Sequence, residues 1–77
     1  MPKGSHKIIN MITEIGIAAG EIWHFLDKHG EVALSELLLG IDKPKEVILM
    51  SLGWLAREGH VLVRFENGEY RVNLRKS

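Results

Sequence analysis

The chain of 77 residues contains no cysteine, so neither a disulfide framework nor a thiolate-ligated metal site can form. A chain without cysteine fits a reducing compartment, and we expect the protein to be cytoplasmic. A long uninterrupted apolar run is missing as well. The most apolar stretch, Ile8 to Ile22, is broken by Glu14 and Glu21, whereas a membrane-spanning helix needs about 20 apolar residues. No small-residue cleavage site follows it, so we expect neither a signal peptide nor a membrane partner.

An excess of positive charge is also lacking, because ten basic residues balance ten acidic ones and the formal net charge is zero. Proteins whose affinity comes from neutralising phosphates usually carry a basic excess. Such a chain is not expected to bind nucleic acid through charge alone. Its length fits one small domain that buries only about 60% of the surface of its unfolded chain, so a partner subunit would add stability.

Recognisable catalytic motifs are absent from the sequence. No serine or threonine lies in a nucleophile motif, and no glycine-rich phosphate loop follows a strand. The acidic residues lie where a solvated helix face or a helix cap is expected. The histidines show no i, i+4 pair that could ligate a metal from one helix face: they are His6, His24, His29 and His60. The sequence therefore predicts no enzyme, no cofactor and no metal site.

The first predicted element is a helix that begins at Ile8 or Ile12 and ends at His29, with Gly30 as a left-handed C-terminal cap. Its apolar residues recur at helical spacing and form one stripe that is predicted to face the core. The stripe comprises Ile8, Ile12, Ile15, Ala19, Ile22, Trp23 and Leu26. We expect residues 1–7 to be a flexible N-terminus, residues 8–74 to form the domain, and residues 75–77 to be a basic tail.

Two glycines interrupt the first helix, and each costs up to about 1 kcal/mol of helix propensity relative to alanine. Gly16 and Gly20, with Ala19 beside them, form a shallow strip that another helix could approach closely. One interpretation is that the glycines are tolerated packing sites within the monomer. The other is that they allow close approach of a second subunit.

The next segment has the pattern of a helix-turn-helix. Val32 and Leu34 alternate as a short first strand would, and Ser35 is predicted to cap a short helix that ends at Gly40. After a tight turn, Pro44 disfavours helical geometry at Lys43. Lys43 is therefore expected at the cap of the third helix and Pro44 at its first position.

The third helix is predicted to run from Pro44 to about Glu58 and to stop at Gly59. Its core stripe is expected to contain Val47, Ile48, Ser51, Leu52 and Leu55. The opposite face carries Lys45, Glu46, Leu49, Met50, Gly53 and Arg57, with Trp54 at the border. A helix that is apolar nearly all round is normally covered on more than one side. Trp54 and Met50 could simply cover the first helix within a monomer, or they could meet a partner.

The C-terminal segment has the signature of a β-hairpin, because two alternating runs flank Asn67-Gly68 and a type I′ turn needs positive φ at both central residues. The inward residues are predicted to be Val61, Val63, Phe65, Tyr70, Val72 and Leu74. A two-residue loop fixes the register and pairs Phe65 with Tyr70, Arg64 with Arg71, and Glu66 with Glu69. Diagonal contacts are expected to join each arginine to a glutamate, so that the outer face neutralises itself.

The order of these elements predicts an α+β fold, mainly helical, of the winged helix-turn-helix type: three helices, a short first strand and a C-terminal hairpin wing. The run LGWLAREGHV at residues 52–61, followed by FENGEY and preceded by IAAGEIWHFLDKHGEVALSEL, resembles a small bacterial winged helix-turn-helix family built around a GWLARE motif. Members of that family are largely uncharacterised. The resemblance implies a compact homodimeric winged helix with a DNA-binding or transcription-related role, and it brings no ligand or set of binding residues.

Two functions from different classes remain. The first is binding of double-stranded DNA by a homodimer with a role in transcriptional regulation, through contacts from the third helix, the wing and the tail. Its candidate contacts are Lys43, Lys45, Arg57, Arg64, Arg71, Arg75 and Lys76. The alternative is a dimerisation or protein-interaction module on the same scaffold, without DNA binding. Its candidate interface residues are Gly16, Gly20, Leu49, Met50, Gly53 and Trp54.

Overall fold

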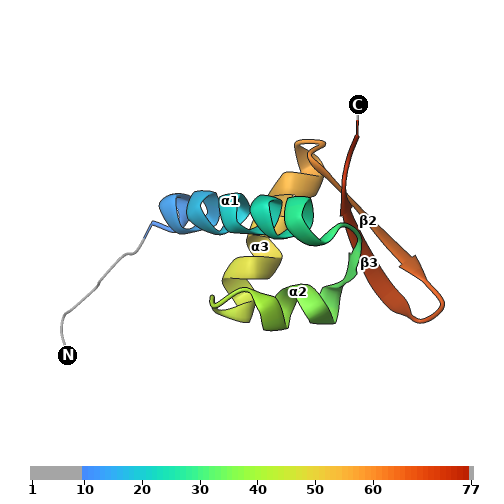
Figure 1. Cartoon of the computed structure of the whole chain (residues 1–77). Helices are drawn as coiled ribbons and strands as arrows, with labels where there is room; N and C mark the ends of the chain where they lie inside the picture. The colour runs from blue at the N-terminus through green and yellow to red at the C-terminus, as the bar shows by residue number, and fades with distance from the viewer. Residues whose placement is uncertain (1–9, 77) are drawn as a thin grey trace.

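A computed structural model describes residues 10–76 as three helices and a three-stranded antiparallel sheet (Figure 1). The elements are α1 (Ile12–His29), β1 (Val32–Ala33), α2 (Leu34–Gly40), α3 (Lys45–Arg57), β2 (Val61–Glu66) and β3 (Glu69–Leu74). The predicted fold, mainly helical with a short first strand and a C-terminal hairpin, is confirmed. Three predicted features lie outside the described residues: the flexible segment 1–7 with His6, the stripe position Ile8, and Ser77.

The hydrophobic core lies where α1 crosses α3 and where the base of the hairpin meets both helices. Ile22, Leu26, Leu37, Ile48 and Val72 are buried at its centre. The predicted core stripe of α3 is confirmed in full, since all five of its residues are buried. The buried polar member, Ser51, donates a hydrogen bond from its hydroxyl to the carbonyl of Val47 at 2.7 Å, so its burial leaves no unsatisfied donor.

The predicted core stripe of α1 holds only in the C-terminal part of the helix. Ala19, Ile22 and Leu26 are buried, whereas Ile12 is 75% exposed and Trp23 is 40% exposed. The prediction that Ile12 and Trp23 face the core is therefore wrong. Figure 1 shows that the N-terminal end of α1 projects beyond the other described elements, which agrees with the exposure of Ile12.

The helices of the helix-turn-helix do not begin at their predicted starts: α2 begins two residues earlier and α3 one residue later. The prediction that Ser35 caps α2 is wrong, because the Glu36 carboxylate accepts the Ala33 N–H at 2.7 Å and α2 starts at Leu34. The prediction that Pro44 is the first helical residue of α3 is also wrong. Pro44 is the cap, and its carbonyl accepts the first helical hydrogen bond from the Ile48 N–H at 3.1 Å.

A glycine stands at or just after the C-terminal end of each helix. Gly59 follows α3 with φ of 81°, and the His60 N–H reaches back to the Leu55 carbonyl at 2.9 Å, as in a Schellman motif. Gly30 has φ of 77° but ψ of −152°, so the predicted left-handed cap is wrong in ψ. Gly40 closes α2 without a side chain because a Cβ there would lie 2.4 Å from the ring of Phe25.

The hairpin has the predicted register and turn. Arg64 faces Arg71, Phe65 faces Tyr70 and Glu66 faces Glu69, while Asn67 and Gly68 have φ of 53° and 80°. The short strand β1 pairs with β3, so the order in the sheet is β1-β3-β2.

The predicted inward face of the hairpin is buried only at its base, at Val61 and Val72. Phe65 and Tyr70 are 63% and 50% exposed, and Val63 is exposed as well, so their predicted inward packing is wrong. The hairpin extends past the helices (Figure 1), and the two aromatic rings near its tip pack on each other, with centroids 4.7 Å apart. The wing therefore presents an exposed apolar end.

Candidate nucleic-acid and protein interfaces

The outer face of α3 is open to solvent along its whole length. Its predicted residues are all exposed: Lys45, Glu46, Leu49, Met50, Gly53 and Arg57. Lys45 and Arg57 lie near the two ends of the helix, about 18 Å apart at 1.5 Å per residue. Neither forms an ion pair with any residue in the range 10–76. These two cations are therefore available to an anionic partner.

Lys43, in the turn before α3, is less available than its position in the sequence indicates. Its Nζ lies 3.6 Å from a carboxylate oxygen of Glu21 on α1, and its side chain is only 26% exposed. The ion pair links the turn of the helix-turn-helix to the first helix. A phosphate would have to compete with Glu21 for this lysine.

The wing arginines are held in a network of five charged side chains on the outer face of the hairpin. Arg64 contacts Glu66 at 3.3 Å, and Arg71 contacts Glu69 at 3.4 Å. Glu31, at the end of the turn between α1 and β1, contacts Arg64 with one oxygen and accepts the Arg71 Nε–H with the other at 3.1 Å. With two cations and three carboxylates, the network carries a net charge of −1.

Each wing arginine does have a hairpin glutamate as its partner, as predicted, although the geometry differs and Glu31 leaves the face with one excess negative charge. Each hairpin glutamate pairs with the arginine two residues away on its own strand, rather than diagonally across the hairpin. Glu31 was not expected in the network at all. Its hydrogen bond is the main reason that the pKa of Arg71 is raised, with smaller electrostatic contributions from Glu69 and from Glu31 itself.

The basic tail lies at the far end of α3 from Lys45. The Arg75 backbone N–H donates to the His60 carbonyl at 3.0 Å, and its guanidinium lies beside Gly59, just after the end of α3. Lys76 lines a hollow that also contains the acidic residues Asp27 and Glu31. The structure therefore places the seven predicted DNA contacts at both ends of α3 and on the wing, rather than in one patch.

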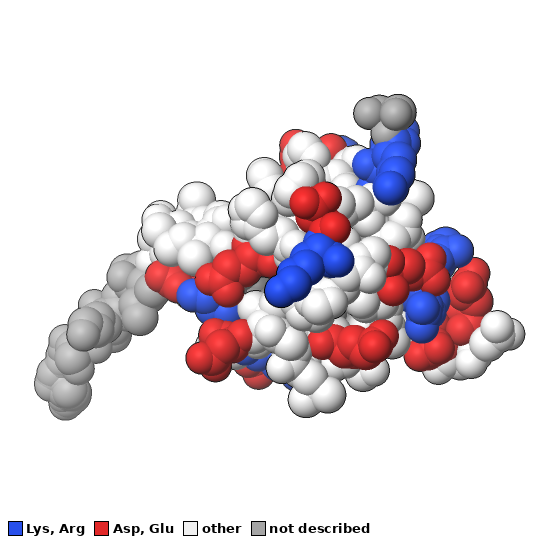
Figure 2. All heavy atoms as spheres, viewed as in Figure 1, with Lys and Arg blue, Asp and Glu red and all other residues white. Residues whose placement is uncertain are grey.

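The charge distribution on the face seen in Figure 2 agrees with this separation of the predicted DNA contacts. Figure 2 shows acidic and basic side chains intermixed over the helices, and basic atoms bordered by acidic ones on the wing. No continuous basic area covers that face. A surface of this kind gives little long-range attraction for a polyanion.

A second candidate surface is a shallow groove between α1 and α3. It consists of two adjoining hollows of about 230 and 300 Å³ that share Gly16 and Trp54. The other residues that line it are Ile12, Ile15, Ala19, Gly20, Trp23, Leu55 and His60. Trp54 covers part of α1 here, yet it remains 48% exposed. The groove is thus apolar, contains two half-exposed tryptophans and has a floor of small residues.

The glycines in the groove are not required by packing within the chain. A Cβ built on Gly16 or on Gly20 would meet no atom within 4 Å, and the same holds for Gly53 on α3. Neither glycine of α1 has positive φ. Both glycines therefore weaken the helix and leave open space on this side of α1.

The six predicted interface residues fall on two surfaces. Gly16, Gly20 and Trp54 line the groove. Leu49, Met50 and Gly53 lie on the exposed part of α3, where Met50 is one turn from Trp54. A partner in the groove would leave most of the outer face of α3 free, whereas a partner on Leu49 would cover the face predicted to meet DNA.

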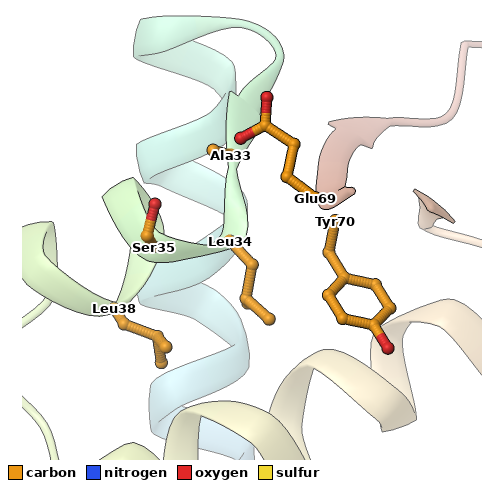
Figure 3. Close-up of a pocket in the computed structure, with 6 residues that line it drawn as sticks. All are labelled: Ala33, Leu34, Ser35, Leu38, Glu69 and Tyr70. Atoms are coloured by element: carbon orange, nitrogen blue, oxygen red, sulfur yellow. The ribbon is translucent and has the colours of Figure 1, made fainter. Parts of the chain in front are cut away.

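A further hollow of about 260 Å³ lies between α2 and the wing (Figure 3). The side chains of Leu34, Leu38 and Tyr70 border it, while the Glu69 carboxylate points away from the Tyr70 ring. Its lining is mostly apolar. Ser35 and Glu69 also line it, but no hydrogen bond joins their side chains among the described residues.

Two further observations concern the described residues alone. Within residues 10–76, no three histidine, aspartate or glutamate side chains gather closely enough to hold a metal ion. None of the three helices in that range combines the length and the apolar character needed to cross a membrane.

Comparison with known proteins agrees with the architecture. The chain is 32% identical over 69 residues to "Uncharacterized protein MJ1608" of the archaeon Methanocaldococcus jannaschii, which covers 86% of this chain and 97% of the relative. No solved structure gives a significant match. The family described as "Winged helix-turn-helix domain (DUF2582)" matches residues 8–74, and the chain belongs to this family.

Proposed function

We propose that the protein is a homodimeric DNA-binding domain with a role in transcriptional regulation, in which α3 lies in the major groove of duplex DNA. The observation that carries the proposal is the open outer face of α3, with Lys45 and Arg57 unpaired among the described residues and the wing beside it. Such a protein acts where duplex DNA is found, which agrees with a cytoplasmic location. The fold of the family supports this function.

The charges on the surface define what kind of binding to expect. Lys45 and Arg57 are two available cations per subunit, and each phosphate neutralised contributes about 0.9 to the slope of log affinity against log salt. We therefore expect weak binding to random sequence, with a contribution of about −2 to the slope from these two cations of each subunit. Leu49, Met50 and Gly53 supply no hydrogen bonds to base edges, so sequence discrimination must depend mainly on Arg57, Lys45 and Glu46.

Fluorescence anisotropy of a labelled random duplex, titrated at about 50 to 200 mM salt, tests the proposal. Binding that weakens as salt rises supports it, and Lys45→Ala should reduce both affinity and slope. Lys28→Ala is the matched control, because Lys28 is an exposed lysine on α1, away from α3. Absence of binding at the lowest salt, or an equal loss in both variants, would contradict a role for α3.

The second candidate function is a protein-interaction module that forms a homodimer through the α1–α3 groove without binding DNA. The specific observation in its favour is the open space beside Gly16 and Gly20 next to exposed Trp23 and Trp54. Small residues surrounded by aromatic side chains are typical of interface cores. Light scattering at high micromolar concentration is expected to give the mass of a dimer, and a monomer there would exclude the homodimer.

A further inference from the structure

Glu31 occupies the space between the two wing arginines. It lies just before β1, the strand that pairs with β3. Its Oε2 accepts a hydrogen bond from the Arg71 Nε–H at 3.1 Å, and its Oε1 accepts one from Nη2 of Arg64. One carboxylate therefore bridges two guanidinium groups that belong to different strands.

The bridge explains an unfavourable feature of the hairpin register. Arg64 and Arg71 stand directly opposite each other on β2 and β3, and like charges in that position repel. Glu66 and Glu69 each contact only the arginine of their own strand. Glu31 is the carboxylate that contacts both. The two arginines are thus arranged around one bound anion with two oxygens.

We propose that Arg64 and Arg71 form a phosphate-binding pair, which Glu31 occupies in the free protein and which a phosphodiester of duplex DNA takes over on binding. The inference rests on the proposed DNA-binding function. It adds a latent site on the wing, which contacts DNA only after Glu31 has been displaced. Guanidinium groups form similar paired hydrogen bonds with carboxylates and with phosphates. The exchange breaks the contacts of Glu31 with both arginines and replaces them with contacts to phosphate oxygens.

The exposure of the partners makes this exchange feasible. The side chains of Arg64 and Glu31 are 42% and 39% exposed, so water can solvate the released carboxylate. Arg71 is 27% exposed, and its guanidinium stays charged when Glu31 moves away, since arginine is not deprotonated in proteins. Exposed ion pairs of this kind contribute little net stability, so a phosphate can displace them at small cost.

Glu31→Gln tests the proposal directly. The variant removes the charge of the bridging carboxylate and keeps its shape, and it should bind random duplex about fivefold to tenfold more tightly at about 50 mM salt. The slope against salt should stay nearly the same, because the arginine pair neutralises the same phosphodiester in both proteins and only the cost of displacing Glu31 is removed. Glu66→Gln removes the same charge from the same network but retains the Glu31 bridge. Asp27→Asn removes a nearby acidic charge outside the network. Both controls should stay close to the unmodified protein.

The outcomes separate this inference from the proposed function. Suppose that the unmodified protein binds DNA, but Glu31→Gln gains no affinity, or no more than Glu66→Gln does. This result would overturn the latent site and leave the proposed function standing. No binding by any variant overturns both proposals. Solvent exchange of the Arg71 Nε–H, followed by NMR without DNA, provides a second readout. It should be faster in Glu31→Gln than in the unmodified protein, and equal rates would show that the bridge does not exist in solution.

Discussion

Two surfaces of this domain, the α1–α3 groove and the outer face of the wing, contrast in how they meet solvent. The groove leaves apolar side chains half exposed, including Trp23 at 40% and Trp54 at 48%. The wing face carries full charges, yet both of its arginines already have carboxylate partners. Among the described residues, the apolar side chains of the groove are thus only partly covered, whereas the charges of the wing are paired within the chain.

The contrast shows that residue type alone does not identify a binding surface. Arginines are the expected contacts to phosphate, but those of the wing become available only after Glu31 moves away. Tryptophans are expected in a core, but Trp54 stands at the edge of a groove with open space beside Gly16. Burial of half-exposed apolar area stabilises a complex more than rearrangement of exposed ion pairs does. We therefore expect variants of the groove to have larger effects than variants of the wing.

The largest effect is expected from Trp54→Glu. A large aromatic residue at the centre of an interface typically contributes about 2 to 4 kcal/mol, so the dimer dissociation constant should rise roughly 30-fold to 1000-fold. Sedimentation equilibrium measures the change. Leu39→Glu is the control, because Leu39 is 89% exposed on α2, outside the groove. Equal dissociation constants for Trp54→Glu and the unmodified protein would remove the groove from the interface.

Intermediate effects are expected from Gly16→Ala and Gly20→Ala, which should stabilise the monomer but weaken the dimer. Each alanine should raise the stability of the monomer by up to about 1 kcal/mol, because helix propensity improves and the new Cβ meets no atom of the chain. The same methyl groups should weaken the dimer if a partner helix packs against the groove. Thermal unfolding at low concentration measures the first change, and sedimentation measures the second.

Gly53→Ala is the matched control for this pair, since its Cβ also meets open space but lies on α3 outside the groove. It should raise stability without changing dimerisation. A weaker dimer in Gly53→Ala alone would instead place the interface on the outer face of α3. That result would conflict with insertion of α3 into DNA as a dimer.

The hairpin and the core of α3 could be predicted from the sequence because each is specified locally. Asn67-Gly68 fixes the turn and thereby the register of six residue pairs, and helical periodicity selects the five buried residues of α3. The exposed start of α1 could not be predicted in this way. Periodicity identifies an apolar stripe, but it does not say where the covering layer ends.

Glu31 illustrates the other limit of the sequence. It is separated by 33 residues from Arg64 and by 40 from Arg71, and no local pattern connects them. The pairing of β1 with β3 brings it beside the wing, since Val32 faces Val72 and Ala33 faces Arg71. A signal in the sequence was the pair of facing arginines, because like charges at that position destabilise the hairpin unless an opposite charge lies nearby.

The smallest effect is expected from Arg64→Gln, measured as the free energy of unfolding in urea. Exposed ion pairs contribute at most about 1 kcal/mol, so removing the Arg64 contacts should change stability by less than that. Val61→Ala on the same strand removes part of a side chain that is only 2% exposed, and it should cost about 2 kcal/mol at equal protein concentration. Equal losses in the two variants would show that the ion network is a structural element of the wing. Displacing Glu31 would then cost too much free energy, and a phosphate could not reach the Arg64–Arg71 pair.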